Sequence, residues 1–537
     1  MVTLIIILSI LVVIVFIYSR GQKSERRRLE TEVDEFKRKL ENKGEQEKPL
    51  KDRETASNAN IIQEKNPEHK ESVVHTVSTP TNTASLSLPQ TIELTDEMKA
   101  AEEAILHDPQ HKIVWIYGAA GTGKSTFLNI IRKKVKRNFV VLAPTGTAAR
   151  LIDGMTIHSF FHLPIKNIYL EPADGYDFLE RRKYRSSLDL WDRIDLIIID
   201  EISMVRADVL DEIDRRMRFA KDSNLPFGGT KMLFLGDPYQ LPPVLKEPDK
   251  ADFYELGYKN EYFFSSWVYE KLLATGKIKH IEFTKIFRQN DAQFLSVLNH
   301  CRLCHFSEQD LAYFNSRVGQ QFDNQILQIT TRKAQAENIN QNEYDKLSGT
   351  EYIFDAIVTK MPDNSTQSET ALEPSKELPA PATLKLKVGT HILLLVNANG
   401  YVNGTTAIIK TIQNDSIIAY DNEQEYRITR HTWENKIYTL SNGNITLKTV
   451  GSYTQFPIAY GWAMTIHKAQ GKTVNAISVS FGNGAFAPGQ AYVALSRVKT
   501  IDGLFLTTKV RAIDFKECKA VTEYFEHIKN RSVQNQD

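Results

Sequence analysis

The chain has 537 residues, 42% of them hydrophobic and 25% charged, a composition typical of folded globular proteins and a length sufficient for two or three domains. Its formal net charge of +1 excludes a protein that binds nucleic acid through an overall basic field, so any such site has to be a local channel. Three cysteines exclude a disulfide framework and indicate a reducing compartment.

The first segment of the chain is apolar. Residues 2–18 contain no charged side chain and span roughly 26 Å as a helix, at the short end of what crosses a bilayer. A signal peptide is the alternative, but no basic stretch precedes the run and no small-residue cleavage site follows it. Arg20, Lys23 and Arg26–Arg28 follow directly, which by the positive-inside rule keeps the rest of the chain cytoplasmic. We therefore expect residues 1–19 to form an uncleaved membrane anchor.

A charged stalk and a polar linker are expected over residues 20–91. Residues 24–47 are dense in Glu, Lys and Arg, and their two heptad-like repeats are too few for a coiled coil, so a solvated helix or a disordered stalk is favoured. Residues 48–90 are rich in Ser, Thr, Asn, Gln and Pro, as in flexible linkers. The folded part is expected to begin near Ile92.

A phosphate-binding loop follows the first apolar strand of the folded part. The stretch KIVWIYGAAGTGKSTFLNIIRKK satisfies G-x-x-x-x-G-K-[ST] with Gly118, Gly123, Lys124 and Ser125. The residues before the loop have the pattern of a strand and those after it the pattern of a helix, which argues against an accidental match. Backbone N–H groups and the helix N-terminus would cradle the phosphates, Lys124 would reach the β- and γ-phosphates, and the Ser125 hydroxyl would coordinate Mg²⁺.

A carboxylate pair supplies the second part of this chemistry. In DLIIIDEIS a buried apolar strand ends in Asp200 and Glu201. Asp200 would hold Mg²⁺ through water, and Glu201 would orient or deprotonate the attacking water. A solvated strand end is the alternative for such a pair, but the phosphate loop upstream argues against it.

Two further apolar strands end in polar residues. FVVLAPTG runs into Pro144, and KMLFLGDPYQ runs into Asp237 and Gln240. Open α/β sheets bind ligands at the carboxyl ends of their parallel strands, so these groups are expected near the phosphates, with Gln240 placed to sense the γ-phosphate. The pattern predicts an α/β fold with a P-loop NTPase core.

A set of motifs occurs in order along the chain: GAAGTGKS, APTGTAARLIDGMTIHSFF, IIIDEISMV, GDPYQLPPV, KIFRQ, TIHKAQGKT and YVALSRV. Together they resemble the superfamily 1 helicases of subclass B, and more narrowly the PIF-type DNA helicases, with the RecD-like helicases as close relatives. The most specific stretch is 207–237, whose acidic and basic residues before PFGG are similar to the PIF-type signature helix and turn. The resemblance covers residues 92 to about 510.

The resemblance implies two RecA-like P-loop NTPase domains with two inserts. The implied segments are a first motor domain at 92–281 with a wedge insert at about 163–190, a second motor domain at 282–402 and 453–515, an SH3-like β insert at 403–452 and a C-terminal tail at 516–537. The wedge would carry a basic patch, although a solvated helix face is a possible alternative for it. The patch comprises Arg181, Arg182, Lys183 and Arg185.

The resemblance also implies roles for single residues. ATP would be bound by Gly118, Ala119, Ala120, Gly121, Thr122, Gly123, Lys124, Ser125, Thr126 and Gly471. Catalysis would rest on Lys124, Asp200, Glu201, Gln240, Arg288 and Arg497. The two arginines would contact the γ-phosphate, Ser125 and Asp200 would serve Mg²⁺, and Gln470 would turn back toward ATP. Met98 stands where the family has a glutamine that reads adenine, which puts strict preference for ATP in doubt.

Single-stranded DNA would be held from both domains. The implied contacts are Pro144, Thr145, Gly146, His158 and Phe160 in the first domain and Thr465, His467 and Lys468 in the second. Phe160 would stack on a base; the alternative is core packing, and either Phe160 or Phe161 is expected in the core. His158 has the alternative of a buried turn histidine.

The implied activity is an ATP- and Mg²⁺-dependent DNA helicase. It would translocate 5′-to-3′ as a monomeric motor on single-stranded DNA and unwind forked or tailed duplexes, in DNA repair, recombination or replication. Two alternatives stay open at this point. One is a RecD-type subunit of a nuclease complex, and the other is a membrane-tethered scaffold that binds DNA without hydrolysing ATP.

Overall fold

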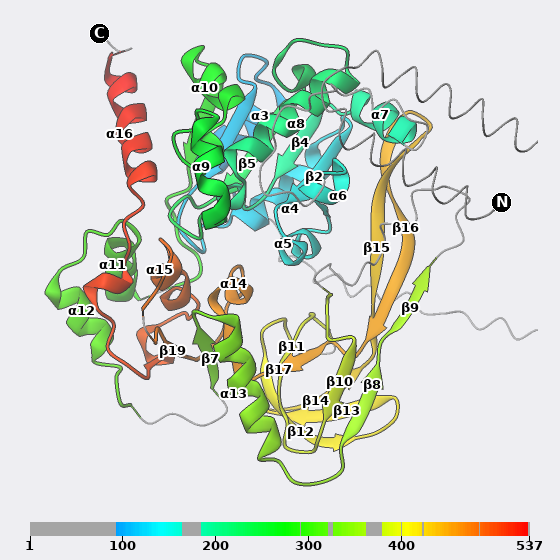
Figure 1. Cartoon of the computed structure of the whole chain (residues 1–537), viewed down its shortest axis with the longest axis vertical. Coiled ribbons are helices and arrows are strands. Elements are labelled where there is room, and N and C mark those ends of the chain that lie inside the picture. The colour runs from blue at the N-terminus through cyan, green and yellow to red at the C-terminus, as the bar shows by residue number, and fades with distance from the viewer. Residues whose placement is uncertain are drawn as a thin grey trace, which may run out of the picture. The chain divides into compact units, whose positions relative to one another are not determined.

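The computed structural model describes residues 93–534, with gaps at 164–183, 290, 321–325, 361–377, 399, 422–423 and 483 (Figure 1). The expected membrane anchor, stalk and linker, and most of the expected wedge, lie outside the described residues. Within the described part, no helix combines the length and the apolar run that a membrane crossing requires.

The first lobe is built on a six-stranded sheet of the order β3-β2-β4-β5-β1-β6, in which every pairing is parallel. Its strands are β1 (Ile113–Tyr117), β2 (Phe139–Ala143), β3 (Met155–Thr156), β4 (Leu196–Ile199), β5 (Lys231–Gly236) and β6 (Ile278–Glu282). Its helices are α3 (Asp96–Leu106), α4 (Lys124–Lys134), α5 (Gly146–Leu151), α6 (Ile157–Phe160), α7 (Arg185–Asp192), α8 (Ala207–Ala220), α9 (Glu247–Glu255) and α10 (Trp267–Ala274). The described residues of this lobe also form three short 3₁₀ turns, at Ile202–Met204, Pro226–Gly229 and Phe263–Ser265.

The continuous apolar strands of this lobe reflect burial on both faces of the sheet. Ile113 and Trp115 of β1 belong to one apolar core, whereas Val114 and Ile116 belong to a second core, and all four are 0% exposed. Because β4, β5 and β1 are neighbours, the residues that follow these strands meet at one edge of the sheet.

The second lobe contains a four-stranded parallel sheet of the order β18-β7-β19-β20. Its strands are β7 (Leu327–Thr330), β18 (Ala463–Thr465), β19 (Ile477–Ser480) and β20 (Leu504–Leu506). Its helices are α11 (Ala292–Arg302), α12 (Glu308–Asn315), α13 (Lys333–Asp345), α14 (Ile466–Ala469) and α15 (Gln490–Leu495), with 3₁₀ turns at Ile501–Gly503 and Ala512–Asp514. The lobe has a core of its own around Leu327, Ile329 and Val479.

A β-rich insert separates α13 from β18. It contains β8 (Tyr352–Asp355), β9 (Ile357–Lys360), β10 (Thr383–Leu386), β11 (His391–Leu394), β12 (Thr406–Ile412), β13 (Ser416–Tyr420), β14 (Glu425–Thr429), β15 (His431–Ser441), β16 (Asn444–Gln455) and β17 (Ile458–Tyr460). Five of these strands form an antiparallel sheet of the order β14-β13-β12-β11-β17. The insert is therefore wider than the expected range of 403–452, because β9 and β11 precede that range and pair with strands in it, while β8 and β10 pair with each other.

A long hairpin and a C-terminal helix both return to the first lobe. The hairpin β15–β16 reaches from the β insert toward α7 (Figure 1). In α16 (Lys519–Gln534), Val521 and Tyr524 belong to the same apolar core as Trp115 of β1. Residues 516–537 were expected as a tail, but most of them form this packed helix.

Candidate nucleotide and nucleic-acid site

The phosphate loop lies between β1 and α4. Gly123 caps α4 in the left-handed conformation, with φ of 84°, which residues with a side chain rarely adopt. Lys124 begins the helix, and its Nζ donates to the carbonyl oxygens of Gly118 at 2.8 Å and Ala119 at 3.0 Å. Burial lowers the pKa of Lys124, an effect opposed by the carboxylates of Asp237 and Glu201. The lysine is thus held within the loop that the sequence predicted to cradle phosphates.

The carboxylate pair follows β4. Asp200 is buried, and its Oδ1 accepts the backbone N–H of Glu201 at 3.0 Å. Glu201 has a left-handed backbone with φ of 52°, although it is not a glycine. Burial and the neighbouring charge of Asp200 raise the pKa of Glu201, which suits a group that accepts a proton from water.

The donor set at this edge fits Mg²⁺, which prefers oxygen ligands. Asp200 is 8% exposed, and among the described residues no cationic side chain lies within ion-pair distance of it. Ser125 exposes its hydroxyl in the first turn of α4. A carboxylate buried without a cation is the kind of group that a divalent ion stabilises.

Two arginines of the second lobe meet at the carbonyl and side chain of one serine. Arg288 Nη1 donates to the Ser496 carbonyl at 3.4 Å, and Arg497 Nη2 donates to Ser496 Oγ at 2.8 Å. Arg497 is 1% exposed, and its other donors go to backbone carbonyls, including Val493 at 2.6 Å. Burial and the charge of Arg288 lower the pKa of Arg497 to about 9, opposed by the nearby carboxylate of Glu201.

These two guanidinium groups have no carboxylate within ion-pair distance in the described part of the chain. Buried cations without an anionic partner are costly, and an anion such as a triphosphate would offset that cost. The structure thus brings both predicted arginines to the side of the cleft that faces Glu201.

Gln470 closes the cleft from the second lobe. It follows α14, and its Nε2 donates to Glu201 Oε2 at 3.0 Å and to Gln240 Oε1 at 3.4 Å. Gln240 follows β5 and is buried. One side chain of the second lobe therefore touches both the carboxylate expected to act on water and the residue expected to sense the γ-phosphate.

Comparisons with known proteins agree with this geometry. The PIF1-like helicase family model matches residues 93–311. A Campylobacter jejuni protein named ATP-dependent DNA helicase Pif1 is 31% identical, over 72% of this chain and 86% of its own length. The crystal structure of Bacteroides sp Pif1 in complex with ADP-AlF4 is 33% identical, with a TM-score of 0.71, and the match covers 82% of this chain and 98% of that one.

The chain belongs to the PIF1-like helicase family. The Danio rerio ATP-dependent DNA helicase PIF1 is 30% identical, and the match covers 81% of this chain but 63% of that protein. The chain therefore spans a little under two thirds of the length of this vertebrate relative.

Six of the eight residues expected to hold DNA in this family member lie at the starts of α5 and α14, and the other two, His158 and Phe160, lie in α6. Thr145 caps α5 by accepting the Ala148 N–H at 3.2 Å, and Thr465 caps α14 by accepting the Lys468 N–H at 3.3 Å. Pro144 and Gly146 beside Thr145 are half-buried, whereas His467 and Lys468 are exposed. His158 is half-buried, and burial lowers its pKa.

Phe160 does not fit the role of a base-stacking residue. It is 4% exposed, and its ring packs edge-to-face against Phe161 at 4.9 Å and Tyr438 at 5.7 Å. Phe161 is 0% exposed, so both phenylalanines are core residues where one was expected. A ring without an open face cannot stack on a base in this conformation.

Gly471 follows α14 and lies beside the end of α5. Its backbone has φ of 76°, and a Cβ placed there would lie 3.5 Å from Leu151 Cδ1 at the end of α5. The expectation that Gly471 binds ATP thus has no phosphate-loop contact to support it, whereas Gln470 beside it reaches Glu201.

Three further residues enter the site that motif comparison had not singled out. Tyr492 Oη accepts the Ala120 N–H of the phosphate loop at 2.9 Å, although the tyrosine lies in the second lobe. Arg302 pairs with Asp237 across the lobes. Phe486 is 50% exposed, and its ring lies 6.5 Å from that of His467 at an angle of 21°. The signal for Tyr492 was its place in YVALSRV; no sequence signal indicated the other two.

Proposed function

We propose that this chain is an ATP-dependent DNA helicase that hydrolyses ATP between its two α/β lobes and moves along single-stranded DNA. The observation that supports this most strongly is the contact of Gln470 with Glu201 and Gln240, which joins the two lobes at the hydrolytic carboxylate. The names of the relatives and the Bacteroides Pif1 complex with ADP-AlF4 support the same activity.

The proposed hydrolysis uses groups from both lobes. Lys124 leaves its backbone carbonyl partners to contact the β- and γ-phosphates, and Glu201 accepts a proton from the attacking water. Arg288 and Arg497 stabilise the charge that develops on the transferred phosphoryl group. Mg²⁺, held by Ser125 and Asp200, would supply further charge neutralisation.

The proposed DNA path runs over the capped ends of α5 and α14. The first turn of a short helix presents backbone N–H groups and hydroxyls to phosphate oxygens, which fixes position without reading sequence. Lys468 adds a positive charge beside Thr465. Phe486, beside His467 and with Arg332 Cζ 5.8 Å from its ring, offers the base-stacking surface that Phe160 lacks.

Movement follows from coupling these grips to the cleft. Each lobe holds the strand with contacts that depend on closure around ATP, so hydrolysis alternates which lobe holds more tightly. The 5′-to-3′ direction, the unwinding of forks and a role in repair, recombination or replication are proposed from family membership. A solved Bacteroides Pif1 structure bound to ssDNA is 33% identical, with a TM-score of 0.58.

The test measures ATPase activity with and without single-stranded DNA, and strand displacement on duplexes with a 5′ or a 3′ tail. We expect hydrolysis to rise on adding DNA, displacement only from the 5′-tailed substrate, and loss of both in K124A. A chain that binds DNA without stimulated hydrolysis would instead be a scaffold. Displacement only from the 3′ tail would overturn the proposed direction.

We also propose, from the sequence, that residues 2–18 anchor this motor to a membrane with its catalytic lobes in the cytoplasm. Cell fractionation of the full-length chain, compared with a variant that lacks residues 2–18, tests this proposal. Recovery of both chains in the soluble fraction would contradict it.

A further inference from the structure

A buried ion pair joins the two lobes next to the nucleotide cleft. Arg302, the last residue of α11, places Nη2 3.0 Å and Nε 3.2 Å from Asp237 Oδ1 at the end of β5. The side chains are 6% and 0% exposed. The Arg302 guanidinium also lies over the Tyr239 ring, 4.7 Å from its centre. Burial lowers the pKa of Arg302 but the Asp237 carboxylate raises it by more, so the guanidinium stays charged, and its planar donors hold the carboxylate in one orientation.

The Asp237 carboxylate in turn organises the loop that carries Gln240. Its Oδ1 accepts the Tyr239 N–H at 3.2 Å, and its Oδ2 accepts Gln240 Nε2 at 3.3 Å. Since the amide nitrogen of Gln240 donates to Asp237, its Oε1 faces Gln470 and accepts Gln470 Nε2. If the Gln240 amide were reversed, its oxygen would face the Asp237 carboxylate and its nitrogen would face Gln470 Nε2, and neither hydrogen bond could form.

The second lobe also touches this loop through its backbone. Gly489, which caps α15 with φ of 72°, lies so close that a Cβ there would be 2.2 Å from the Gln240 carbonyl oxygen. The loop that carries Gln240 is thus held by α11 through Arg302 and by the start of α15 through Gly489.

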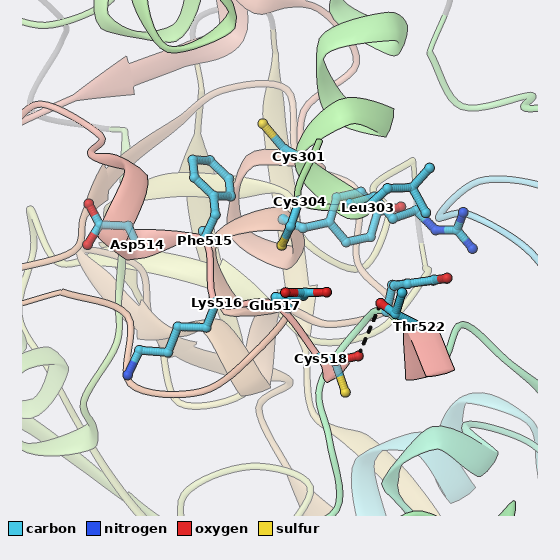
Figure 2. A pocket seen from close by; sticks show the side chains of 14 residues that line it. Cys301, Leu303, Cys304, Asp514, Phe515, Lys516, Glu517, Cys518 and Thr522 are labelled. Atoms are coloured by element: carbon cyan, nitrogen blue, oxygen red, sulfur yellow. Dashed lines mark hydrogen bonds between the residues drawn. The ribbon is translucent and has the colours of Figure 1, made fainter. Parts of the chain in front are cut away.

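A small pocket lies beside the ion pair and is lined by residues of both lobes (Figure 2). All three cysteines of the chain line it. Burial raises the pKa of Cys304 to about 11 and that of Cys301 further, so these thiols stay protonated and unreactive. The pocket is therefore not a reactive thiol site.

We infer that Arg302 is a positioning residue for ATP hydrolysis, an inference that rests on the proposed function. From the second lobe it holds Asp237 and thereby sets the orientation of Gln240. The oriented Gln240 accepts from Gln470 and keeps it against Glu201. Movement of α11 with the second lobe is thereby transmitted to the carboxylate that acts on water.

The test uses R302M and R302K in the full chain, with kcat and KM for ATP measured with and without single-stranded DNA. We expect R302M to lower the DNA-stimulated kcat by about 100-fold, a loss typical of misplaced catalytic groups, while KM for ATP stays close to that of the unaltered chain. R302K retains the charge but not the paired donors, so its kcat should lie between that of R302M and that of the unaltered chain.

R317M is the matched control. Arg317 also lies in the second lobe and donates to backbone carbonyls, Leu504 among them at 2.9 Å, but it touches no residue of the cleft. It should leave kcat and DNA stimulation unchanged. If R317M lowered the DNA-stimulated kcat as much as R302M does, loss of any arginine that packs in the second lobe would be enough to impair hydrolysis, and the inference would be overturned.

The double variant D237N/R302M separates positioning from stability. Removing both charges relieves the unpaired carboxylate that R302M leaves behind, so the melting temperature should recover while the DNA-stimulated kcat stays low. If both the melting temperature and the DNA-stimulated kcat recovered, the ion pair would be only structural and the inference would be overturned. An R302M variant whose ATPase is stimulated by DNA as in the unaltered chain would overturn it as well. If the unaltered chain hydrolysed no ATP, the proposed function would fail and the inference with it; an active chain whose R302M variant is unchanged defeats the inference alone.

Discussion

Glu201 adopts a backbone conformation that residues other than glycine rarely take, with φ of 52°. Such a conformation costs about 1–3 kcal/mol and persists where the surrounding structure enforces it, commonly at functional sites. Here the buried strand β4 ends two residues earlier, at Ile199, and the turn directs the carboxylate toward Gln470. The left-handed turn thus accompanies the contact of this carboxylate with Gln470.

Replacing Glu201 with glutamine should separate binding from hydrolysis. E201Q keeps the side-chain shape but cannot accept a proton, so kcat should fall by about 100- to 10,000-fold while nucleotide still binds. Steady-state ATPase kinetics and equilibrium binding of a fluorescent ATP analogue provide the measurements. E282Q alters an exposed carboxylate at the end of β6 and should behave like the unaltered chain; equal activity of E201Q would remove Glu201 from the mechanism.

Gly489 and Gly276 allow a matched test of the close approach between lobes. Both have left-handed backbones, with φ of 72° and 67°, but a Cβ at Gly276 meets nothing within 4 Å. G276A should therefore cost only the backbone strain, about 1–2 kcal/mol. G489A also forces the Gln240 carbonyl away, so DNA-stimulated ATPase should fall in this variant alone. Equal effects of the two on ATPase would argue against a tight interface at Gly489.

At the scale of elements, the hairpin β15–β16 seals the open edge of β2. Tyr438 Oη accepts the Val141 N–H at 2.9 Å, and the hairpin turn bonds Asn138 through Gly443 at 3.1 Å and Ile445 at 3.0 Å. β3 pairs with only two residues of β2, so this donor of Val141 would otherwise lack a strand partner. The β insert is thereby linked to the strand that leads into Thr145.

Removing the Tyr438 hydroxyl should loosen this contact without disturbing its packing. Y438F should cost about 1 kcal/mol and raise hydrogen exchange at the Val141 amide, measured by mass spectrometry or NMR. Y453F is the control, because Tyr453 Oη donates to Ala380 within the same insert at 2.8 Å. An unchanged Val141 amide in Y438F would mean that the hairpin does not dock there in solution.

Because α16 packs against the buried His280, we expect the free energy of unfolding to depend on pH. Tyr524 Oη lies 2.8 Å from His280 Nε2 and 2.5 Å from Tyr269 Oη, and burial lowers the pKa of His280 from 6.5 to about 4. The unfolded chain binds this proton more readily, so stability is complete above pH 6.5 and is lost as pH falls toward 4. The loss should reach about 3 kcal/mol.

Urea unfolding between pH 4 and 7 measures this dependence. H280Q removes the titrating group and should flatten the part of the curve that His280 contributes. A variant with the same slope as the unaltered chain would show that other groups produce the acid sensitivity.

At the scale of the whole described unit, the lobes meet through residues that each lobe extends toward the other. Gln470 Nε2 of the second lobe donates to Glu201 Oε2 of the first lobe at 3.0 Å. Within the second lobe, Gln289 Nε2 donates to the Ser496 and Val498 carbonyls at 3.3 Å, which holds the segment of Arg288 against α15. Tyr492 bonds the phosphate loop at Ala120. Each of these contacts lies beside the phosphate loop, the carboxylate pair or the two arginines, so residues of both lobes together complete the site.

Removing Arg288 or Arg497 should therefore leave nucleotide binding intact and slow ATP hydrolysis. R288A and R497A should reduce single-turnover hydrolysis by about 1,000-fold, because the missing charge acts on the transition state. R288K and R497K keep the charge and should retain more activity. Unchanged hydrolysis in both alanine variants would place the transition-state charge elsewhere.

The sequence by itself determined the features whose partners are neighbours along the chain. The turn at Gly123 before Lys124, and the end of an apolar strand at Asp200 and Glu201, are local patterns, and strand, turn and helix follow from them. The order of the motifs also sufficed to recognise the family and to place Arg288 and Arg497 in one cleft.

Only the tertiary structure decided features whose partners lie far apart in the chain. Arg302 and Asp237 are 65 residues apart, Tyr438 and Val141 are 297 apart, and Tyr524 and Tyr269 are 255 apart. The resemblance of a motif indicates which residue types occur in which order, not which side chains this fold buries, and Phe160 was misassigned for that reason. Whether an arginine is an exposed cation or a buried residue that orients a carboxylate depends on which segments pack against it, and no local sequence pattern carries that information.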